Sequence, residues 1–200
     1  MPAGPALYDR PALYDQEDVP RHWDEYYSDP ANLDFTPSPL VLQIAEVVRP
    51  GRALDLACGH GRNALYLASL GWQVTAVDSS AVAIGILRNQ AAGRAVDARI
   101  ADLERGEYSI PADSFNLICD FLYLQRDLFG PIREGLKPGG IFAGAFLLVG
   151  ATGQGPGNPA FRLQPGELRN EFADWKILFY SESAEARRTH REARIIARKA

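Results

Sequence analysis

Cysteine and long apolar runs are scarce in this chain. Only two of its 200 residues are cysteine, and both Cys58 and Cys119 lie in stretches that we expect to be buried strands or strand ends. Two such cysteines do not indicate a disulfide framework, which suits a reducing compartment. No apolar run approaches the ~20 residues of a membrane span, and the N-terminus has neither the basic nor the apolar region of a signal peptide. We therefore expect a cytoplasmic protein with no membrane partner.

An excess of positive charge is lacking too. The formal net charge is −4, and 46% hydrophobic with 23% charged residues is ordinary for a globular domain. Proteins whose surface is made for nucleic acid usually show a basic excess, so the composition disfavours nucleic acid as a partner. The spacing of histidine, cysteine and carboxylate residues shows no metal-ligand cluster, Ser-His-Asp set or paired-carboxylate arrangement. We expect no metal.

The N-terminus differs in pattern from the rest of the chain. The phrase Pro-Ala-Leu-Tyr-Asp occurs at residues 5–9 and again at residues 11–15, and we expect residues 1–19 to form a flexible arm. Residues 20–200 should form a single domain, with residues 20–50 as its N-terminal cap helices. Trp23, Tyr26 and Tyr27 fall on one face of a short helix, which either docks on the core or forms a lid over a ligand.

Strand and helix patterns alternate through the remainder. We expect buried strands, listed here with their approximate limits, at residues 53–56, 72–77, 95–101, 115–122 and 141–148. Helical patterns separate them, and such alternation implies right-handed crossovers and a parallel sheet. A glycine-rich stretch at 150–159 should be a mobile loop at the edge of the crevice, followed by a short helix at 165–172. Two last strands, 175–180 and 192–200, should pair antiparallel. The result is an α/β fold with a doubly wound, seven-stranded, mostly parallel sheet and an antiparallel C-terminal strand.

The first strand ends in a turn that is suited to bind a polar small molecule. Asp55 is followed by small residues and by Gly59 and Gly61, after which a helix begins. Glycine lets the backbone approach a ligand closely or adopt positive φ, and the helix start directs free N–H groups and a positive dipole end into the same space.

The next two strands end on aspartates as well. Asp55, Asp78 and Asp102 would all face the crevice beyond the carboxyl ends of the strands. Asp55 can orient the turn or accept from an ammonium group, Asp78 can accept from the two hydroxyls of a ribose, and Asp102 can accept from an exocyclic amine such as that of adenine. An amino-acid head, a ribose and an adenine in this order describe S-adenosylmethionine.

At these residues the chain resembles the class I S-adenosylmethionine-dependent methyltransferases. The matching segments are 55–61 for the glycine-rich motif, Asp78 for the acidic ribose-binding residue, 101–103 for the adenine side and 136–140 before the fifth strand. Within that superfamily, Trp-Asp-Glu-Tyr-Tyr at 23–27 and Cys-Gly-His-Gly-Arg-Asn at 58–63 resemble the compact tellurite-resistance and thiopurine-type small-molecule methyltransferases.

The resemblance implies a Rossmann-like fold and a set of cofactor-binding residues. S-adenosylmethionine would be the cofactor and S-adenosylhomocysteine the product. The implied cofactor-binding residues are Asp55, Ala57, Gly59, Gly61, Arg62, Asp78, Ser79, Asp102, Leu103 and Asp120. Among them, Asp120 would meet the ammonium group. Asp78 alone could also be a helix cap, and Arg62 could be either a partner of the cofactor carboxylate or a solvated side chain.

Catalytic and acceptor residues are less well marked. His60 or Tyr123 could act as a base, although a histidine in a turn can simply tolerate the backbone geometry. A small-molecule methyl acceptor could contact aromatic residues that could equally be core, namely Trp23, Tyr27, Phe35, Phe121, Tyr123 and Phe146. Methyl transfer from a sulfonium is an in-line displacement that depends on positioning and water exclusion. A sulfur, selenium or tellurium acceptor would need little help from a base, whereas an alcohol or amine would need one.

Two other functions fit parts of the pattern. Residues 59–64 also satisfy G-x-G-x-x-A and Asp78 follows ~20 residues later, as in a nicotinamide-dependent oxidoreductase. Against that, the dinucleotide pattern does not require a carboxylate at Asp55 and leaves Asp102 without a task. A nucleic-acid-binding module could use the basic residues near the C-terminus, Arg187, Arg188, Arg191, Arg194, Arg198 and Lys199. Interspersed glutamates favour a solvated sheet edge there.

Overall fold

The computed structural model describes residues 19–149, 159–184 and 191–200. The expected N-terminal arm at 1–19 and the glycine-rich loop at 150–159 lie, except for their last residues, outside the described residues. Within the described ranges, no helix combines the length and apolar character needed to cross a membrane.

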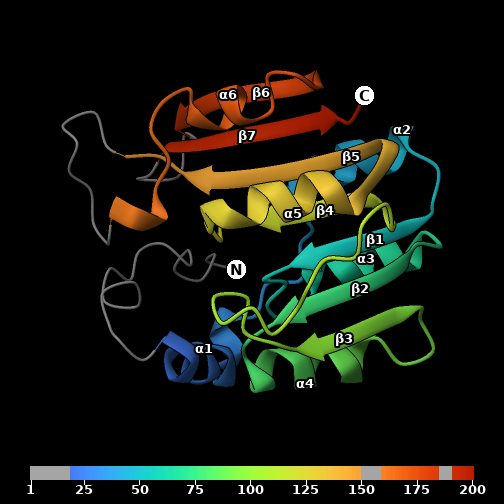
Figure 1. Ribbon diagram of the computed structural model, residues 1–200. Coiled ribbons are helices and arrows are strands. Elements are labelled where there is room, and N and C mark those ends of the chain that lie inside the picture. Colours follow the sequence, from blue (N-terminus) through green and yellow to red (C-terminus); the bar gives the residue numbers. More distant parts are fainter. Residues whose placement is uncertain (1–18, 150–158, 185–190) are drawn as a thin grey trace.

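One sheet of seven strands organises the fold, in the order β3-β2-β1-β4-β5-β7-β6. The strands are β1 (Arg52–Leu56), β2 (Gln73–Asp78), β3 (Val96–Ile100), β4 (Phe115–Phe121), β5 (Leu136–Leu147), β6 (Lys176–Ala184) and β7 (Arg191–Arg198). Strands β1 to β5 pair in parallel, whereas β7 pairs antiparallel with both β5 and β6. In Figure 1 the β7 arrow points opposite to those of β1–β5. The predicted doubly wound α/β sheet with an antiparallel C-terminal strand is confirmed.

Helices cover both faces of this sheet. They are α1 (Val19–Ser28), α2 (Pro39–Val47), α3 (Arg62–Ser69), α4 (Ala81–Gln90), α5 (Phe129–Gly135) and α6 (Glu167–Glu171), with 3-10 turns η2 (Pro30–Asn32), η3 (Arg126–Leu128) and η4 (Pro159–Phe161). One apolar cluster joins the sheet to α5 and α6, and a second joins it to α2, α3 and α4. Helix α1 lies beside α4 near the carboxyl ends of β2 and β3 (Figure 1).

The central strands are buried on both faces because their side chains alternate between the two clusters. In β1, Leu54 and Leu56 pack toward α5 and α6, whereas Ala53 packs toward α2, α3 and α4. An apolar run with no polar alternation is what a parallel strand covered on both sides requires. Apolar residues on both faces of β1 therefore suit a strand in the interior of the sheet. Because β1 lies between β2 and β4, the carboxyl ends of these three strands lie side by side.

Some element limits differ from the sequence prediction. Strand β5 begins at Leu136 instead of Ile141, because the segment 136–140, which was expected to precede the strand, pairs with the C-terminus: Gly139 N donates to Lys199 O at 3.1 Å and Lys199 N to Gly140 O at 2.9 Å. Helix α6 covers only Glu167–Glu171, since Gly166 adopts φ +80° directly before it. Strand β6 continues to Ala184, because its pairing with β7 extends to Arg191.

Candidate functional site

The turn between β1 and α3 contains three residues in the left-handed region. Ala57, Gly59 and Gly61 have φ of +46°, +55° and +83°. The Cys58 amide donates to Val77 O at 3.0 Å, and the Gly61 amide donates to Cys58 O at 3.0 Å. Because the chain is held so tightly, the turn brings the start of α3 to the carboxyl end of β1.

Asp78 joins this turn to the turn after β2. Its Oδ2 accepts from the Gly59 amide at 2.7 Å, and its Oδ1 accepts from the Ser80 amide at 2.9 Å. The N-cap of α4 is Ser80, whose Oγ accepts from the Ala83 amide at 3.1 Å. Burial raises the pKa of Asp78, and the two amide donors oppose that shift. Since a carboxylate has about four acceptor positions, Asp78 keeps acceptor capacity for a ligand.

Asp55 and Asp120 each have one buried carboxyl oxygen without a hydrogen-bond partner among the described residues. Each side chain is only 1% exposed, and Leu56 and Asp120 are register partners on the adjacent strands β1 and β4. In the part of the chain that the structure describes, Asp55 Oδ2 and Asp120 Oδ1 have no hydrogen-bond partner. Burial raises the pKa of Asp55 to about 7 and that of Asp120 well above its usual range. Buried carboxyl oxygens without a donor are unfavourable, so a cationic ligand group would stabilise this edge of the sheet.

Arg62 lies in the first turn of α3, half-buried. Its positive charge lowers the pKa of Asp55, opposing the larger effect of burial. The positive charge of Arg62 therefore favours the ionised form of Asp55. Arg62 is also a cationic side chain directly next to the glycine turn.

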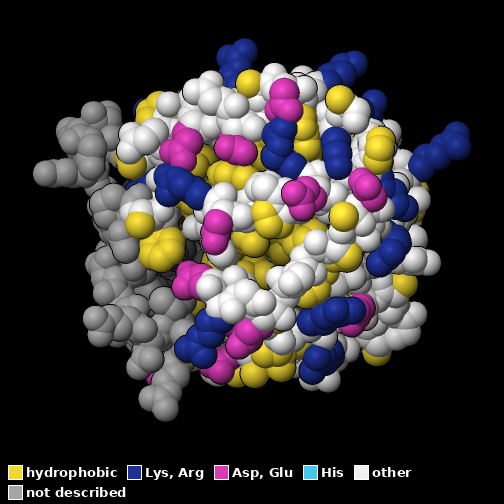
Figure 2. Space-filling view, viewed as in Figure 1, with side chains coloured by type: hydrophobic (Ala, Val, Ile, Leu, Met, Phe, Trp, Pro, Cys, Tyr) yellow, Lys and Arg dark blue, Asp and Glu magenta, His cyan; other side chains and the backbone are white. Residues whose placement is uncertain are grey.

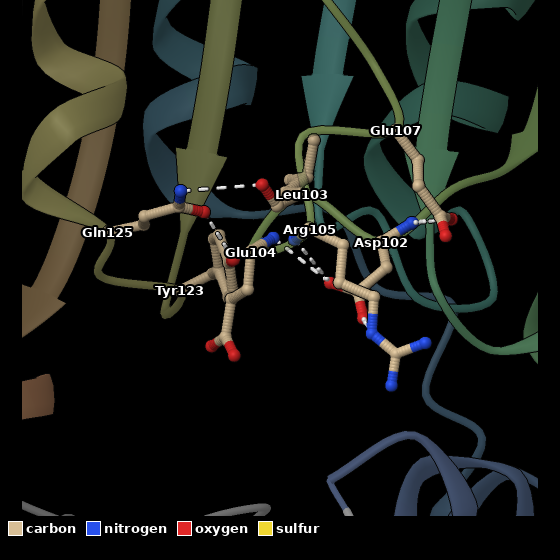
Figure 3. A network of polar contacts seen from close by, with 7 residues as sticks. All are labelled: Asp102, Leu103, Glu104, Arg105, Glu107, Tyr123 and Gln125. Carbon is tan, nitrogen blue, oxygen red and sulfur yellow. Dashed lines mark hydrogen bonds and ion pairs between the residues drawn. The ribbon is translucent and has the colours of Figure 1, made fainter.

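The loop after β3 is tied to the segment after β4 by a polar network (Figure 3). Asp102 Oδ1 accepts from the Glu104 amide at 2.9 Å, and its own amide donates to Glu107 Oε2 at 2.9 Å. From the other side, the Tyr123 hydroxyl donates to Gln125 Oε1 at 2.6 Å, and Gln125 Nε2 donates to Leu103 O at 3.4 Å. Hydrogen bonds thus tie the two loops together beyond the carboxyl ends of β3 and β4.

His60 fastens the loop before α2 to the glycine turn. A carbonyl can only accept, so His60 Nε2 carries the proton that it donates to Asp34 O at 2.9 Å. The Phe35 ring stands edge-on to the imidazole at 4.7 Å. Burial lowers the pKa of His60, which keeps the ring neutral at pH 7. Its contacts are those of a side chain that holds a loop in place.

The six aromatic residues considered for the acceptor pocket do not gather in one place. Tyr27 from α1 lies over the turn, since a Cβ at Gly59 would be 2.3 Å from the Tyr27 hydroxyl. Trp23 stacks on Tyr27 at 6.1 Å, and the Tyr27 ring is 5.6 Å from His60, the same ring that Phe35 contacts. Tyr123 stands after β4 in the network described above.

Phe121 and Phe146 pack in the core. Phe121 belongs to the apolar cluster on the side of α2, α3 and α4. Phe146 is 1% exposed and packs edge to face on Phe129 at 5.9 Å. The sequence left two alternatives for these aromatic residues, an acceptor pocket or the core, and Phe121 and Phe146 lie in the core.

Three residues at the site were not found from the sequence. Leu122, directly after β4, has φ +71°, a strained conformation for a branched side chain that is typical of functional turns. Asp24 reaches the start of α4 from α1, and Gln125 joins the two loops. Asp24 belongs to the Trp-Asp-Glu-Tyr-Tyr motif, and that motif is the sequence signal by which its role could have been found. Nothing local marks Leu122 or Gln125.

Most of the chain is similar to proteins of a known family. A family model described as "Tellurite resistance protein TehB" matches residues 21–199. The Haemophilus influenzae protein named "Probable S-adenosyl-L-methionine-dependent methyltransferase TehB" is 28% identical over 149 residues, which are 72% of this chain and 52% of that protein. "Hemagglutinin 1" of Eikenella corrodens is 32% identical over 158 residues, 72% of this chain and 50% of that protein.

A solved structure extends the similarity to the fold. The crystal structure of TehB from Haemophilus influenzae matches with a TM-score of 0.73 and 23% identity, over 90% of this chain and 67% of that one. The chain spans about half the length of the curated relatives it matches.

Proposed function

Since the chain belongs to the tellurite resistance protein TehB family, we propose that it is an S-adenosylmethionine-dependent methyltransferase that acts on a small molecule. The observation that carries the proposal is the pair of buried carboxyls, Asp55 and Asp120, each with one unpartnered oxygen. They lie on neighbouring strands whose ends border the glycine turn. A ligand with an ammonium group satisfies both oxygens, and the methionine part of S-adenosylmethionine carries such a group.

The remaining residues of the site fit the rest of that cofactor. Asp78 and Ser79 would hold the ribose, Asp102 and Leu103 the adenine, and Arg62 the carboxylate. Ala57, Gly59 and Gly61 would let the backbone of the turn approach the methionine part. When bound, the cofactor supplies a methyl carbon that is activated by the sulfonium, and S-adenosylhomocysteine is the product. The task of this chain is to orient the acceptor in line and to exclude water.

The hydrogen bonds of the two candidate bases, His60 and Tyr123, favour a methyl acceptor that needs little deprotonation. His60 Nε2 donates to a backbone carbonyl. The Tyr123 hydroxyl donates to Gln125, and burial together with the nearby Glu104 and Asp120 raises the pKa of this tyrosine further. A soft nucleophile such as a thiol, selenol or tellurol group fits this site, whereas an alcohol would need a base.

Calorimetric titration with S-adenosylmethionine, S-adenosylhomocysteine and NAD tests the cofactor. We expect micromolar binding of the first two ligands and none of NAD. Binding of NAD alone would overturn the proposal. A screen of thiols, chalcogen oxyanions, phenols and amines for methyl acceptance then identifies the acceptor class.

Replacing Asp78 tests the ribose assignment. Asp78→Ala should weaken binding of S-adenosylhomocysteine about 10- to 100-fold, because hydrogen bonds to a charged group contribute ~1.5–3 kcal/mol. Circular dichroism should still show a folded protein. An unchanged dissociation constant would mean that this carboxylate only connects the two turns.

Replacing His60 tests the absence of a histidine base. His60→Gln keeps an N–H donor near the Asp34 carbonyl, so kcat for the acceptor found in the screen should stay within about tenfold, since loss of a general base costs about 10²- to 10⁴-fold. Tyr123→Phe, measured in parallel, should behave alike. A fall of a thousandfold in either variant would identify that side chain as the base.

Neither alternative function finds support in the comparisons. For a nucleic-acid-binding module, Figure 2 shows basic and acidic side chains interspersed on the face it presents. Of the C-terminal basic residues, Arg194 pairs with Glu192 at 2.9 Å and Lys199 Nζ donates to Leu136 O at 2.6 Å, while Arg187 and Arg188 lie outside the described residues. These residues lie in or beside β7, an inner strand between β5 and β6, and not at the solvated edge that the sequence predicted, and Glu192 is buried there.

A further inference from the structure

Asp24, on helix α1, contacts the start of the neighbouring helix α4. Its Oδ1 accepts from the Ser80 hydroxyl at 2.6 Å and from the Val82 amide at 3.1 Å. Ser80 already caps α4 through the Ala83 amide. Asp24 therefore satisfies a further free amide of the α4 N-terminus, where a carboxylate is also favoured by the helix dipole.

The contacts of Asp24 continue into the cofactor site. Ser80, which donates its hydroxyl to Asp24, donates its amide to Asp78 Oδ1 at 2.9 Å. Asp78 Oδ2 in turn accepts from the Gly59 amide at 2.7 Å. Three hydrogen bonds thus lead from α1 through the turn after β2 to the glycine turn.

The path then returns to α1 through Tyr27. The Tyr27 hydroxyl lies against Gly59, at the place where a Cβ would be only 2.3 Å away. Tyr26 and Tyr27 are buried in a small apolar cluster with Ala83 of α4. Helix α1 therefore contacts both turns that border the cofactor site, one through a carboxylate and the other through a phenol.

We propose that Asp24 is a positioning residue for the cofactor site: by fastening α1 to the turn after β2, it sets the relative placement of Asp78 and the glycine turn. This inference rests on the proposed function, since Asp78 and Gly59 are the residues assigned there to the ribose and the methionine part. Asp24 itself need not touch the ligand, because it acts through Ser80 and through the docking of α1.

Substitutions at Asp24 test this role with S-adenosylhomocysteine as the probe. Asp24→Ala removes both acceptor contacts and should weaken binding at least tenfold, measured at a temperature at which circular dichroism confirms that the variant is folded. Asp24→Asn keeps an acceptor oxygen at the same distance and should bind within threefold of the wild type. Asp24→Ser, whose side chain is too short to reach Ser80, should bind as weakly as the alanine variant. It replaces the alanine variant in the binding test if that variant does not fold.

Asp29→Ala is the matched control. Asp29 follows α1 and accepts from the Ala31 amide at 2.9 Å as the cap of η2, but among the residues that the structure describes no hydrogen bond connects its side chain to the cofactor turns. This variant should lose some thermal stability and keep the affinity of the wild type. Equal loss of affinity in Asp24→Ala and Asp29→Ala would overturn the inference, because it would reduce Asp24 to a stabilising cap.

Amide hydrogen exchange of the ligand-free protein separates this inference from the proposed function. In Asp24→Ala the amides of Gly59 and Ser80 should exchange at least tenfold faster, whereas that of Ile118 in β4 should not change. If the wild type fails to bind S-adenosylhomocysteine, the proposed function fails, and the exchange rates still decide whether Asp24 holds the two turns. Unchanged exchange at Gly59 and Ser80 would overturn the inference.

Discussion

Asp55→Asn is expected to unfold at a higher urea concentration than the wild type at pH 8 and to bind S-adenosylhomocysteine about 10- to 100-fold more weakly. The carboxyl is 1% exposed, and burial raises its pKa to about 7. A group whose pKa is raised by folding favours the folded state below its unfolded pKa, and that contribution is lost as the pH rises through the folded pKa. The wild type should therefore lose stability between about pH 4 and pH 7, and the asparagine variant should lose less over this range, since only the contributions of Asp78 and Asp120 remain.

The size of the gain follows from two opposing effects. A shift from 3.8 to about 7 corresponds to about 4 kcal/mol. The asparagine amide would stand where Asp55 Oδ2 has no partner, and an unsatisfied buried group costs about 1–3 kcal/mol. We therefore expect a net gain of about 1–3 kcal/mol at pH 8 that disappears below pH 4, measured by urea unfolding across this range.

The matched control for Asp55 is an exposed aspartate on the same sheet. Asp97 in β3 has a side chain that is 57% exposed and pairs with Arg99. Asp97→Asn should change stability by less than about 0.5 kcal/mol and leave the affinity unchanged. If Asp55→Asn proved less stable than the wild type at pH 8, the ionised carboxylate would stabilise the folded protein, contrary to our argument.

Gly61→Ala is expected to destabilise the protein by about 3 kcal/mol or more and to abolish cofactor binding at micromolar concentration. Its φ is +83°, and a Cβ would lie 2.3 Å from Leu87 Cδ1 and 2.9 Å from both Leu87 Cδ2 and Cγ. Leu87 is fully buried in the core and cannot withdraw. Left-handed strain costs about 1–2 kcal/mol, and overpacking a buried site costs about 1–3 kcal/mol more. The turn must then shift, and the Gly61 carbonyl that accepts from Leu65 at 2.8 Å shifts with it.

Gly71→Ala separates the two contributions. Gly71 has φ +90°, and a Cβ there would meet nothing within 4 Å. This variant should show the backbone strain alone, about 1–2 kcal/mol, and normal affinity. Thermal unfolding of both variants and calorimetry with S-adenosylhomocysteine provide the comparison. Equal destabilisation in the two would show that the contact with Leu87 is relieved by a small movement and that Gly61 is needed only for its φ.

Much of the fold could be predicted because the relevant signals are local. Runs of apolar residues on both faces marked the central strands, Asp78 marked a possible helix cap, and the glycines marked a turn with positive φ. Each of these depends on the side chains and dihedral angles of a few consecutive residues. The family resemblance rested on the same stretches, so it too could be found without a structure.

Contacts between distant segments could not be predicted in this way. Strand β5 begins at Leu136 because Gly139 and Gly140 pair with Lys199, some sixty residues later. Phe146 was considered for the acceptor pocket, yet it packs on Phe129 in the core. In both cases the local sequence gives no indication of the distant partner that decides the structure of the segment.

By itself the sequence determined that several aspartates end successive strands, and in that pattern they look equivalent. Tertiary structure decided their different states: Asp78 is occupied by the amides of Gly59 and Ser80, whereas Asp55 and Asp120 are each left with an unpartnered oxygen. It also decided that Asp24 belongs to this group, through its contact with Ser80. The physical reason is that a carboxyl's ionisation and free acceptor positions depend on burial and on donors from other segments, which only the folded chain brings together.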